Sequence, residues 1–360
     1  MKRVVASLLI SVAAAVLGAC STQETVLAPR DPALAVREAR GTSTSYTVTQ
    51  IALLPGHREG FAWEVNNSGQ VVVQSNYWPE SGLIQGHWFI RASGQNHMIG
   101  AVVRGISSGP VTYLAGSNGS EPLRWSFDPK TGVSEPTMLD LSGGGFASAV
   151  NDNGDVIGRI GYAAGGGDAA IWMIDGTRIL VPNVDPSLYE GVEGRDITSA
   201  GDAVIQFHDN SGLHRGYARI ASGTPVELPP LTGHVSTLVR GISEPVSGKV
   251  YVAGTSDDRN GNYRAVRWTI DRTNGAIIAR EVMSDRSYSN AMADDGTIAG
   301  DLSGSANTTA FVWKLTGVTT LKTPKGSNSG RAHAISGDGK HVAGDALSGG
   351  YRIPIYWTAP

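Results

Sequence analysis

The sequence predicts an all-β fold, a seven-bladed β-propeller closed by an N-terminal outer strand. Three observations point to it. A pattern of about 45 residues occurs seven times, each copy has the signals of four short strands joined by turns, and the last copy lacks an outer strand that residues near the start of the domain can supply. Glycine accounts for 47 of the 360 residues, about twice its usual share, which is typical of a chain with many turns.

The first marker of each copy is a strand, a glycine turn and a second strand. Ala147–Gly154 runs into Asp155–Gly158 in this way, and Asn290–Gly296 runs into Thr297–Gly300. The copy at Gly105–Gly109 is one residue shorter than the regular copies, and the copy at Gly241–Gly248 is two residues longer. The turn glycines are 40 to 48 residues apart and stand at Gly69, Gly109, Gly154, Gly201, Gly248, Gly296 and Gly339.

The second marker is a tryptophan 16 to 20 residues after the turn glycine. The fourth copy has Arg219 in its place. We expect these side chains to fill the space between blades, so they indicate no cofactor. They are Trp88, Trp125, Trp172, Trp268, Trp313 and Trp357.

The third marker is one more glycine turn and an apolar strand, as in 175–180 and 317–321. The seventh copy stops at Trp357 without this strand, but residues 48–56 align with residues 318–326. An N-terminal strand that completes the last blade would close the ring and remove exposed sheet edges. We therefore expect a propeller over residues 46–360, with six or eight blades as the alternatives.

The repeat resembles the bacterial extracellular HAF repeats, in which A-x-x-[IV]-N-x-x-G-x-[VI]-x-G is followed by A-F-x-W. Residues 149–158 and 310–313 carry the pattern best, and the resemblance extends over nearly all of residues 56–360. It departs where a histidine would precede Ala-Phe, since Thr309 stands there. The resemblance implies a repeat fold and brings no catalytic residues.

The first twenty residues have the pattern of an export signal. Lys2 and Arg3 precede the apolar stretch Val4–Val16, which is too short to span a bilayer as a helix. The stretch is followed by Leu-Gly-Ala-Cys, which resembles the bacterial lipobox and implies acylation at Cys20. We expect a lipoprotein signal peptide over residues 1–19 and a lipidated flexible tether over residues 20–45. The alternative is ordinary signal cleavage.

The predicted partner of this segment is a membrane, reached through the lipid on Cys20. Two or more acyl chains hold a protein stably on a bilayer. By resemblance to enterobacterial sorting, Ser21 favours the outer membrane, on either its periplasmic or its surface side. The net charge of −3 argues against a nucleic-acid partner. We expect a monomer.

Motifs that would indicate catalysis are missing from the sequence: it has no G-x-S-x-G elbow, no P-loop, no HExxH and no sialidase-type Asp box. His208 and His214 share one predicted loop, but they lack further ligands for a zinc site. Residues 257–262 could hold calcium, yet Arg267 stands at the twelfth position of an EF-type loop. A single cysteine excludes internal disulfides and Cys-rich zinc sites. We therefore assign no metal, cofactor or catalytic residue and leave calcium open.

The loops expected on one face of the propeller are longer than the glycine turns of the opposite face. Binding residues concentrate on such loops over a rigid scaffold. Tyr77, Trp78 and Tyr263 stand in these loops, and exposed aromatic side chains suit contact with sugars or proteins. The alternative is that they pack against their own loops.

A second set of candidates stands two residues before the Ile, Val or Met that ends each inner strand. In a closed ring these positions should gather near the channel mouth, on the face of the long loops. Three arginines and a histidine there could bind an anion or carboxylate, although Glu64 and Asp196 could pair with them instead. The seven positions are Trp63, Arg104, Ser148, Arg195, Arg240, Asn290 and His333.

These observations together favour a non-catalytic recognition module for protein or glycan ligands at the cell envelope. One alternative is a scaffold in an envelope complex, which a large apolar patch would favour. The other is a hydrolase or lyase with its site at the channel mouth, which would need converging carboxylates or a histidine with shifted pKa.

Overall fold

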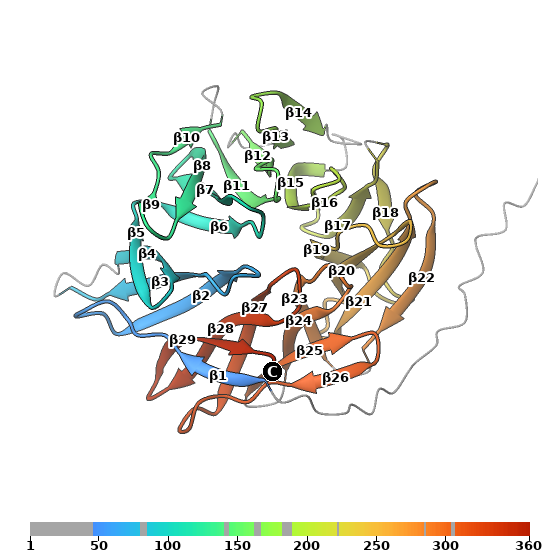
Figure 1. The fold of residues 1–360 in the computed structure, drawn as a ribbon. Helices are drawn as coiled ribbons and strands as arrows, with labels where there is room; N and C mark the ends of the chain where they lie inside the picture. Colours follow the sequence, from blue (N-terminus) through green and yellow to red (C-terminus); the bar gives the residue numbers. More distant parts are fainter. Residues whose placement is uncertain are drawn as a thin grey trace, which may run out of the picture. The chain divides into compact units, whose positions relative to one another are not determined.

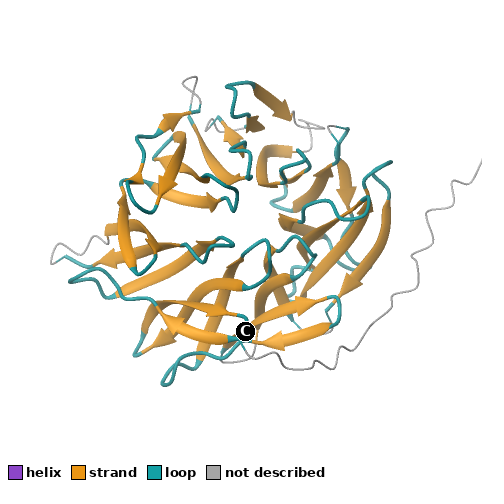
Figure 2. Ribbon diagram, in the orientation of Figure 1, coloured by secondary structure: helices purple, strands orange, loops and turns teal. Residues whose placement is uncertain are grey.

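The computed structural model describes residues 46–79, 85–139, 144–161, 167–181, 189–221, 223–283, 286–303 and 307–360. The predicted signal peptide, Cys20 and the tether lie outside these residues. The described residues form strands and loops only (Figure 2), so no helix among them could cross a membrane.

Seven antiparallel sheets are arranged around a central axis, which confirms the predicted seven-bladed propeller (Figure 1). We number the blades in chain order, and each runs from an inner strand at the axis to an outer strand at the rim. Blade 1 contains β2 (Glu59–Val65), β3 (Val71–Tyr77), β4 (Gln85–Ala92) and β5 (Gln95–Ile99). Blade 2 contains β6 (Val102–Ile106), β7 (Thr112–Asn118), β8 (Glu121–Asp128), β9 (Gly132–Val133) and β10 (Thr137–Met138). Blade 3 contains β11 (Gly145–Val150), β12 (Val156–Ile160), β13 (Asp168–Trp172) and β14 (Arg178–Val181).

The other four blades repeat this order. Blade 4 contains β15 (Tyr189–Ile197), β16 (Ala203–Asp209), β17 (His214–Arg219) and β18 (Val226–Leu228); blade 5 contains β19 (Ser236–Ile242), β20 (Lys249–Asp257), β21 (Tyr263–Asp271) and β22 (Ile277–Val282); blade 6 contains β23 (Ser287–Met292), β24 (Ile298–Ser303), β25 (Thr308–Lys314) and β26 (Gly317–Thr320); blade 7 contains β27 (Ser329–Ile335), β28 (His341–Ser348), β29 (Tyr351–Thr358) and β1 (Thr47–Gln50).

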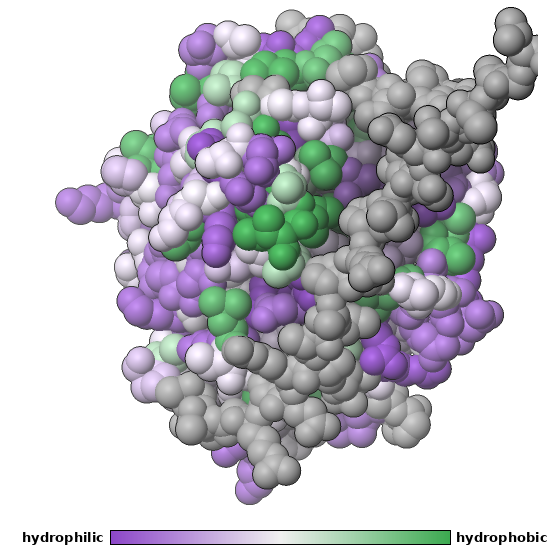
Figure 3. All heavy atoms as spheres, turned by 90° about the vertical axis from the view of Figure 1, so that its right-hand side faces the viewer, coloured by the Kyte–Doolittle hydropathy of each residue, from purple (hydrophilic) through white to green (hydrophobic). Residues whose placement is uncertain are grey.

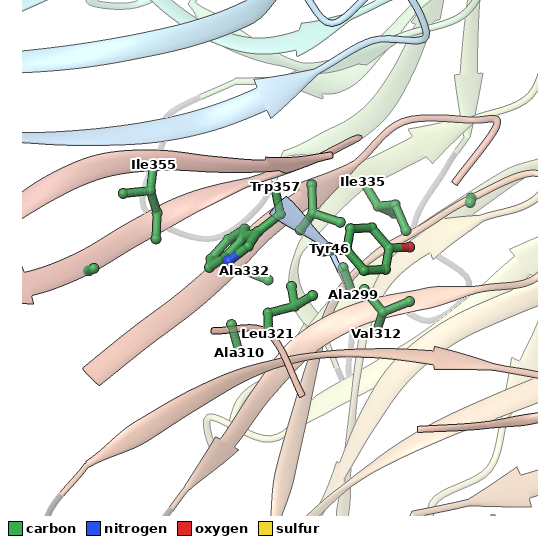
Figure 4. Close-up of a cluster of buried hydrophobic side chains, with 12 residues drawn as sticks. Tyr46, Ala299, Ala310, Val312, Leu321, Ala332, Ile335, Ile355 and Trp357 are labelled. Atoms are coloured by element: carbon green, nitrogen blue, oxygen red, sulfur yellow. The ribbon is translucent and has the colours of Figure 1, made fainter. Parts of the chain in front are cut away.

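The ring is closed by the N-terminal strand, as predicted. β1 pairs antiparallel with β29, with Val48 opposite Trp357. Tyr46 precedes β1 and is buried in the same cluster as Trp357 (Figure 4), and its hydroxyl donates to the carbonyl of Gly339 at 3.0 Å. Residues from both ends of the domain therefore complete one blade.

Apolar side chains fill the layers between neighbouring blades, which is why the strands are rich in small and β-branched residues. Five of the predicted tryptophans occupy one repeat position, as Trp172 does opposite Val156. The prediction was wrong for Trp88. In blade 1, Arg91 holds that position opposite Val71, whereas Trp88 lies three residues earlier, opposite Gln74. Trp88 packs instead in the layer between blades 1 and 2.

Every inner strand carries a β-bulge at the same place, so one residue has no partner on the second strand. A glycine on the second strand accompanies the bulge in several blades. A Cβ on Gly158 or Gly344 would collide with the carbonyl of Phe146 or Arg331, two residues before the bulge. The seven bulged residues are Trp63, Arg104, Ser148, Arg195, Arg240, Asn290 and His333.

The asparagine of the repeat pattern holds the tight turn and the next blade together. The Oδ1 of Asn151 accepts hydrogen bonds from the amides of Asn153 and Asp155 at 3.0 and 2.9 Å. Its Nδ2 donates to the carbonyl of Thr198 in blade 4 at 2.9 Å. Asn66 makes the equivalent contact from blade 1 to Ser107 in blade 2 at 3.0 Å.

The rim of the propeller is mixed in polarity. Figure 3 shows one side of it, the right-hand side of Figure 1, where hydrophobic residues form small patches among hydrophilic ones. Exposed apolar side chains occur on outer strands of several blades, as at Met98, Leu180 and Ile278. Scattered residues of this kind are ordinary on the surface of a folded protein.

Candidate functional site

Two cavities meet in the central channel. The first, of about 180 Å³, is lined by residues of the tight turns, among them Asp152, Glu244 and Asp294. The second, of about 550 Å³, extends toward the long loops and is lined by Trp63, Trp88 and other residues. Six residues line both cavities: Glu64, Arg104, Ser148, Arg195, Arg240 and Asn290.

The channel thus brings together the predicted ring positions, because the bulge turns one residue of each inner strand toward the axis. Their depth differs from the prediction. The sequence places them at the mouth on the long-loop face, whereas the structure places them at the waist where the two cavities meet. The sequence pattern marks the bulge but carries no information about how far it lies from either face.

The three arginines differ in their partners. Nη2 of Arg195 lies 2.9 Å from Oε2 of Glu193, while its Nε is buried without a hydrogen-bond partner among the described residues. Arg104 and Arg240 make no hydrogen bond or ion pair with any residue that the structure describes, and both side chains are exposed to solvent in the channel. Burial lowers the pKa of Arg195 to about 10 and also lowers the pKa of Arg240. Arg195 still carries its charge at neutral pH.

Glu64 lines both channel cavities with the arginines, and Asp196 lines the cavity on the side of the tight turns. Burial and the neighbouring Asp196 raise the pKa of Glu64 well above its ordinary value, although Arg104 opposes this. Burial also raises the pKa of Asp196 to about 7, with Glu244 and Asp294 adding to the effect. Asp196 accepts the amides of Ile197 and Ile242, both at 2.9 Å, so it helps to join blades 4 and 5.

Glu193 is the acid that sequence reasoning missed. It stands two residues before Arg195 on β15, and this spacing places two side chains on one face of a strand. Its pKa is lowered despite burial, because His208, Arg195 and Arg240 surround it. On the long-loop side, two guanidinium groups, those of Arg195 and Arg240, therefore face this carboxylate.

Three of the other ring positions, Trp63, Asn290 and His333, have hydrogen-bond partners within the protein. Nε2 of His333 lies 2.6 Å from Oδ1 of Asp345, whose second oxygen accepts from Arg352 at 2.6 Å. The ring of Trp63 packs against that of His333 with centroids 4.6 Å apart.

Asn290, on blade 6, donates to Asp301 at 2.9 Å and to the carbonyl of Ala332 at 2.8 Å. His333, a predicted ligand residue, is thus held in a structural pair with Asp345. The Oγ of Ser148 is buried without a partner among the described residues. Among the ring positions, the buried polar atoms without a hydrogen-bond partner are therefore Oγ of Ser148 on blade 3 and Nε of Arg195 on blade 4.

The predicted aromatic candidates lie away from the channel. Tyr77 and Trp78 are 39% and 44% exposed at the end of β3, and the ring of Tyr77 packs near His57. Tyr263 stacks on Tyr288 with centroids 3.9 Å apart and donates to Ser303 at 2.7 Å. None of the three predicted residues lines either channel cavity.

No group of three His, Cys, Asp or Glu side chains that could hold a metal ion occurs in the described part of the chain. His208 and His214 pack edge to face with centroids 4.7 Å apart, and His208 lies 3.7 Å from Glu193. In the polar turn at 257–262, Asp258 accepts from the amides of Asn260 and Asn262 and so caps its own turn.

Neither a family model nor a curated protein sequence matches this chain. Among solved structures, it is similar to the β-propeller domain of the Trilobed protease from Pyrococcus furiosus. The alignment covers 84% of this chain and 94% of that chain, with a TM-score of 0.55 and 9% identity. That domain has an open velcro topology, whereas β1 closes the ring here.

The chain is also similar to the acylaminoacyl peptidase of Pyrococcus horikoshii and to a puromycin hydrolase. The TM-scores are 0.55 and 0.53, the identities 10% and 13%, and the alignments cover 84% and 87% of this chain. They cover 52% and 53% of those proteins, so this chain spans about half their length. Likeness at such low identity establishes one thing, that the fold is a β-propeller.

Proposed function

We propose that this chain is a non-catalytic recognition module that binds an anionic group of a protein or glycan ligand in its channel. One observation carries the proposal: Arg104, Arg195 and Arg240 project from equivalent bulges into the channel, and two of them make no hydrogen bond or ion pair with a described residue. Blade packing does not require arginine there, since Ser148 and Asn290 hold the same position in other blades.

Guanidinium groups suit this role because their planar donors match carboxylate, sulfate and phosphate oxygens. Each hydrogen bond to a charged group contributes about 1.5–3 kcal/mol. An unpaired guanidinium in a narrow channel must stay hydrated or find an acceptor, since burying it alone is costly. A ligand anion that bridges two arginines would satisfy them together.

The test is a calorimetric titration of uronic-acid sugars, with the matched neutral sugars as the control. Wild type is compared with the Arg195→Ala/Arg240→Ala double variant at low and moderate ionic strength. We expect the variant to bind the anionic sugar at least tenfold more weakly, and wild type to lose affinity as salt screens the charges. Equal affinities, or no anion binding by wild type at low salt, would refute the proposal.

Anchoring at the cell envelope belongs to the same proposal. The lipobox-like end of the signal sequence at Cys20 and the likeness of the repeats to HAF repeats support it. A channel held near a membrane would then sample ligands of the envelope.

A second candidate, a hydrolase with its site in the channel, is favoured by one feature. Glu64 and Asp196 line the same cavity, and both have raised pKa values. A protonated and an ionised carboxyl group side by side can act as general acid and base. Turnover of a peptide or glycoside that is lost in both Glu64→Gln and Asp196→Asn would establish it.

A further inference from the structure

A third cavity, of about 370 Å³, adjoins the channel between blades 1 and 2. It shares four lining residues with the larger channel cavity: Trp88, Val102, Ser117 and Gly119. Arg104 lines the channel cavity at the inner end of this path, and Met98, which is 55% exposed, lines the outer end. The path therefore joins the arginines of the waist to the outside of the propeller.

The cavity arises because blades 1 and 2 pack less closely than the others. At the other six boundaries, the second and third strands of one blade pack against the inner strand of its neighbour, as β12 and β13 do against β15. Between blades 1 and 2 the main contacts are β2 with β6 and β5 with β9. Trp88, the tryptophan that departs from its repeat position, forms part of the wall.

The walls of this cleft differ in chemistry from the channel. Of the described residues that line it, none is Lys, Arg, Asp or Glu, and its polar side chains are those of His87, Ser117 and Asn118. Trp88, Ile99, Ala101 and Val102 belong to the apolar layer between the two blades or pack against it. The apolar cleft and the cationic waist thus suit two different parts of one ligand.

We propose that the ligand is a carboxylate joined to an apolar group, with the carboxylate at Arg104, Arg195 and Arg240 and the apolar group in the cleft between blades 1 and 2. This inference rests on the proposed function, since it names the ligand class of the same channel. A free apolar carboxylic acid and a peptide with an apolar C-terminal residue share this chemistry. Burial of apolar surface adds roughly fourfold in affinity for each methylene removed from water.

The experiment titrates acetate, butyrate and 3-phenylpropionate into the full chain, with 3-phenylpropionamide as the uncharged control. We expect 3-phenylpropionate to bind at least tenfold more tightly than acetate, and the amide to bind far more weakly than the acid. N-acetyl-Gly-Gly-Phe and its C-terminal amide form a second arm. Tighter binding of the peptide than of 3-phenylpropionate would identify a peptide C-terminus as the source, and the reverse would identify a free acid.

The matched variant is Gly100→Phe, which adds a bulky ring at a residue that lines the cleft. A Cβ at Gly100 meets no atom within 4 Å, and its backbone is not in the left-handed region, so the larger side chain is accommodated. We expect this variant to bind acetate as wild type does and to bind 3-phenylpropionate no more tightly than acetate.

Two results separate the inference from the proposed function. If wild type binds acetate and 3-phenylpropionate equally, or if Gly100→Phe leaves their ratio unchanged, the cleft does not hold the ligand and this inference fails alone. If no carboxylate binds at low ionic strength, the proposed function fails and the inference fails with it. If the Gly100→Phe variant does not fold, the affinities of wild type for acetate, butyrate and 3-phenylpropionate still test the inference.

Discussion

A single bulged residue of each inner strand contributes to the lining of the channel. The bulge removes that residue from the ladder, so its identity is free to vary among Trp, Arg, Ser, Asn and His without loss of sheet pairing. The glycine on the neighbouring strand is less free, because a Cβ would meet a carbonyl oxygen. Five of the seven blades have this glycine beside the variable position, whereas Val73 and Ile205 hold its place in blades 1 and 4.

Gly344→Ala tests this constraint. We expect the free energy of unfolding to fall by about 1–3 kcal/mol, because the bulge at His333 must shift to admit the methyl group. Gly100→Ala is the control, since a Cβ there meets nothing within 4 Å, and its effect should stay within about 0.5 kcal/mol. Chemical denaturation measures both, and equal stabilities would contradict the account.

Asp196 should make stability depend on pH. Burial raises its pKa to about 7 in the folded chain, whereas an unfolded Asp titrates near 3.9. Between these values the folded state binds the proton more tightly, so the free energy of unfolding falls as pH rises toward and through about 7. Asp196→Asn should flatten that slope between about pH 5 and 8. Urea titrations of both proteins at each pH measure it, and parallel curves would show that Asp196 does not carry the effect.

At the scale of elements, the tight turns link each blade to the next. The amide of Asn67 donates to Ser108 at 3.1 Å, the amide of Ser108 to Asp152 at 2.6 Å, and the amide of Ser199 to Glu244 at 2.6 Å. Acidic residues on this face thus accept backbone hydrogen bonds from the neighbouring blade. Their clustering follows from turn structure and needs no ligand to explain it.

Asn151→Ala measures the strength of one such link. The substitution removes the hydrogen bond to Thr198 and leaves turn amides of blade 3 without their acceptor. We expect a loss of about 1–3 kcal/mol in the free energy of unfolding. Asn153→Ala, which removes one exposed hydrogen bond to Ser199, should cost clearly less. If the two variants have equal free energies of unfolding, the buried Asn151 is not the stronger link between the blades.

For the whole molecule, the repeat predicts blade number and closure because both depend on periodicity alone. The alignment of residues 48–56 with 318–326 correctly identifies the strand that completes blade 7. Counting from turn glycines misplaces Trp88, because the length of the loop between second and third strands varies and the register between them is not encoded in the spacing.

The site is predicted only in part for a similar reason. The repeat position predicts that the three arginines lie in the channel. How far they lie from either face, and which residues the ring positions pair with, depend on packing. His333 pairs with Asp345, twelve residues away on the neighbouring strand. The cleft between blades 1 and 2 has no signal in the sequence, since it arises from how closely two blades pack.

Closure by β1 can be tested by truncation. Removal of residues 20–44 should leave the melting temperature nearly unchanged. Removal through Leu54 should lower it and promote aggregation, because the edge of β29 becomes exposed and the buried Tyr46 and Ile51 are lost. Thermal melts and light scattering on both variants decide this. Identical melts of two monomeric variants would mean that β1 does not stabilise blade 7.

Anchoring is tested by Cys20→Ala. Because two or more acyl chains are needed for stable attachment, loss of the thiol should move the protein from the membrane fraction to the soluble fraction. Immunoblots of the two fractions measure this, with Ser21→Ala as a control that keeps the cysteine. Unchanged membrane partition of Cys20→Ala would exclude the lipid anchor.

The central claim, that the channel waist binds an anion, is tested most directly by anomalous diffraction from crystals soaked in bromide. The account predicts the strongest bromide peak in contact with the guanidinium groups of Arg104, Arg195 and Arg240, and its absence in the Arg195→Ala/Arg240→Ala variant. Bromide peaks confined to the outer surface, with an empty waist in wild type, would contradict it.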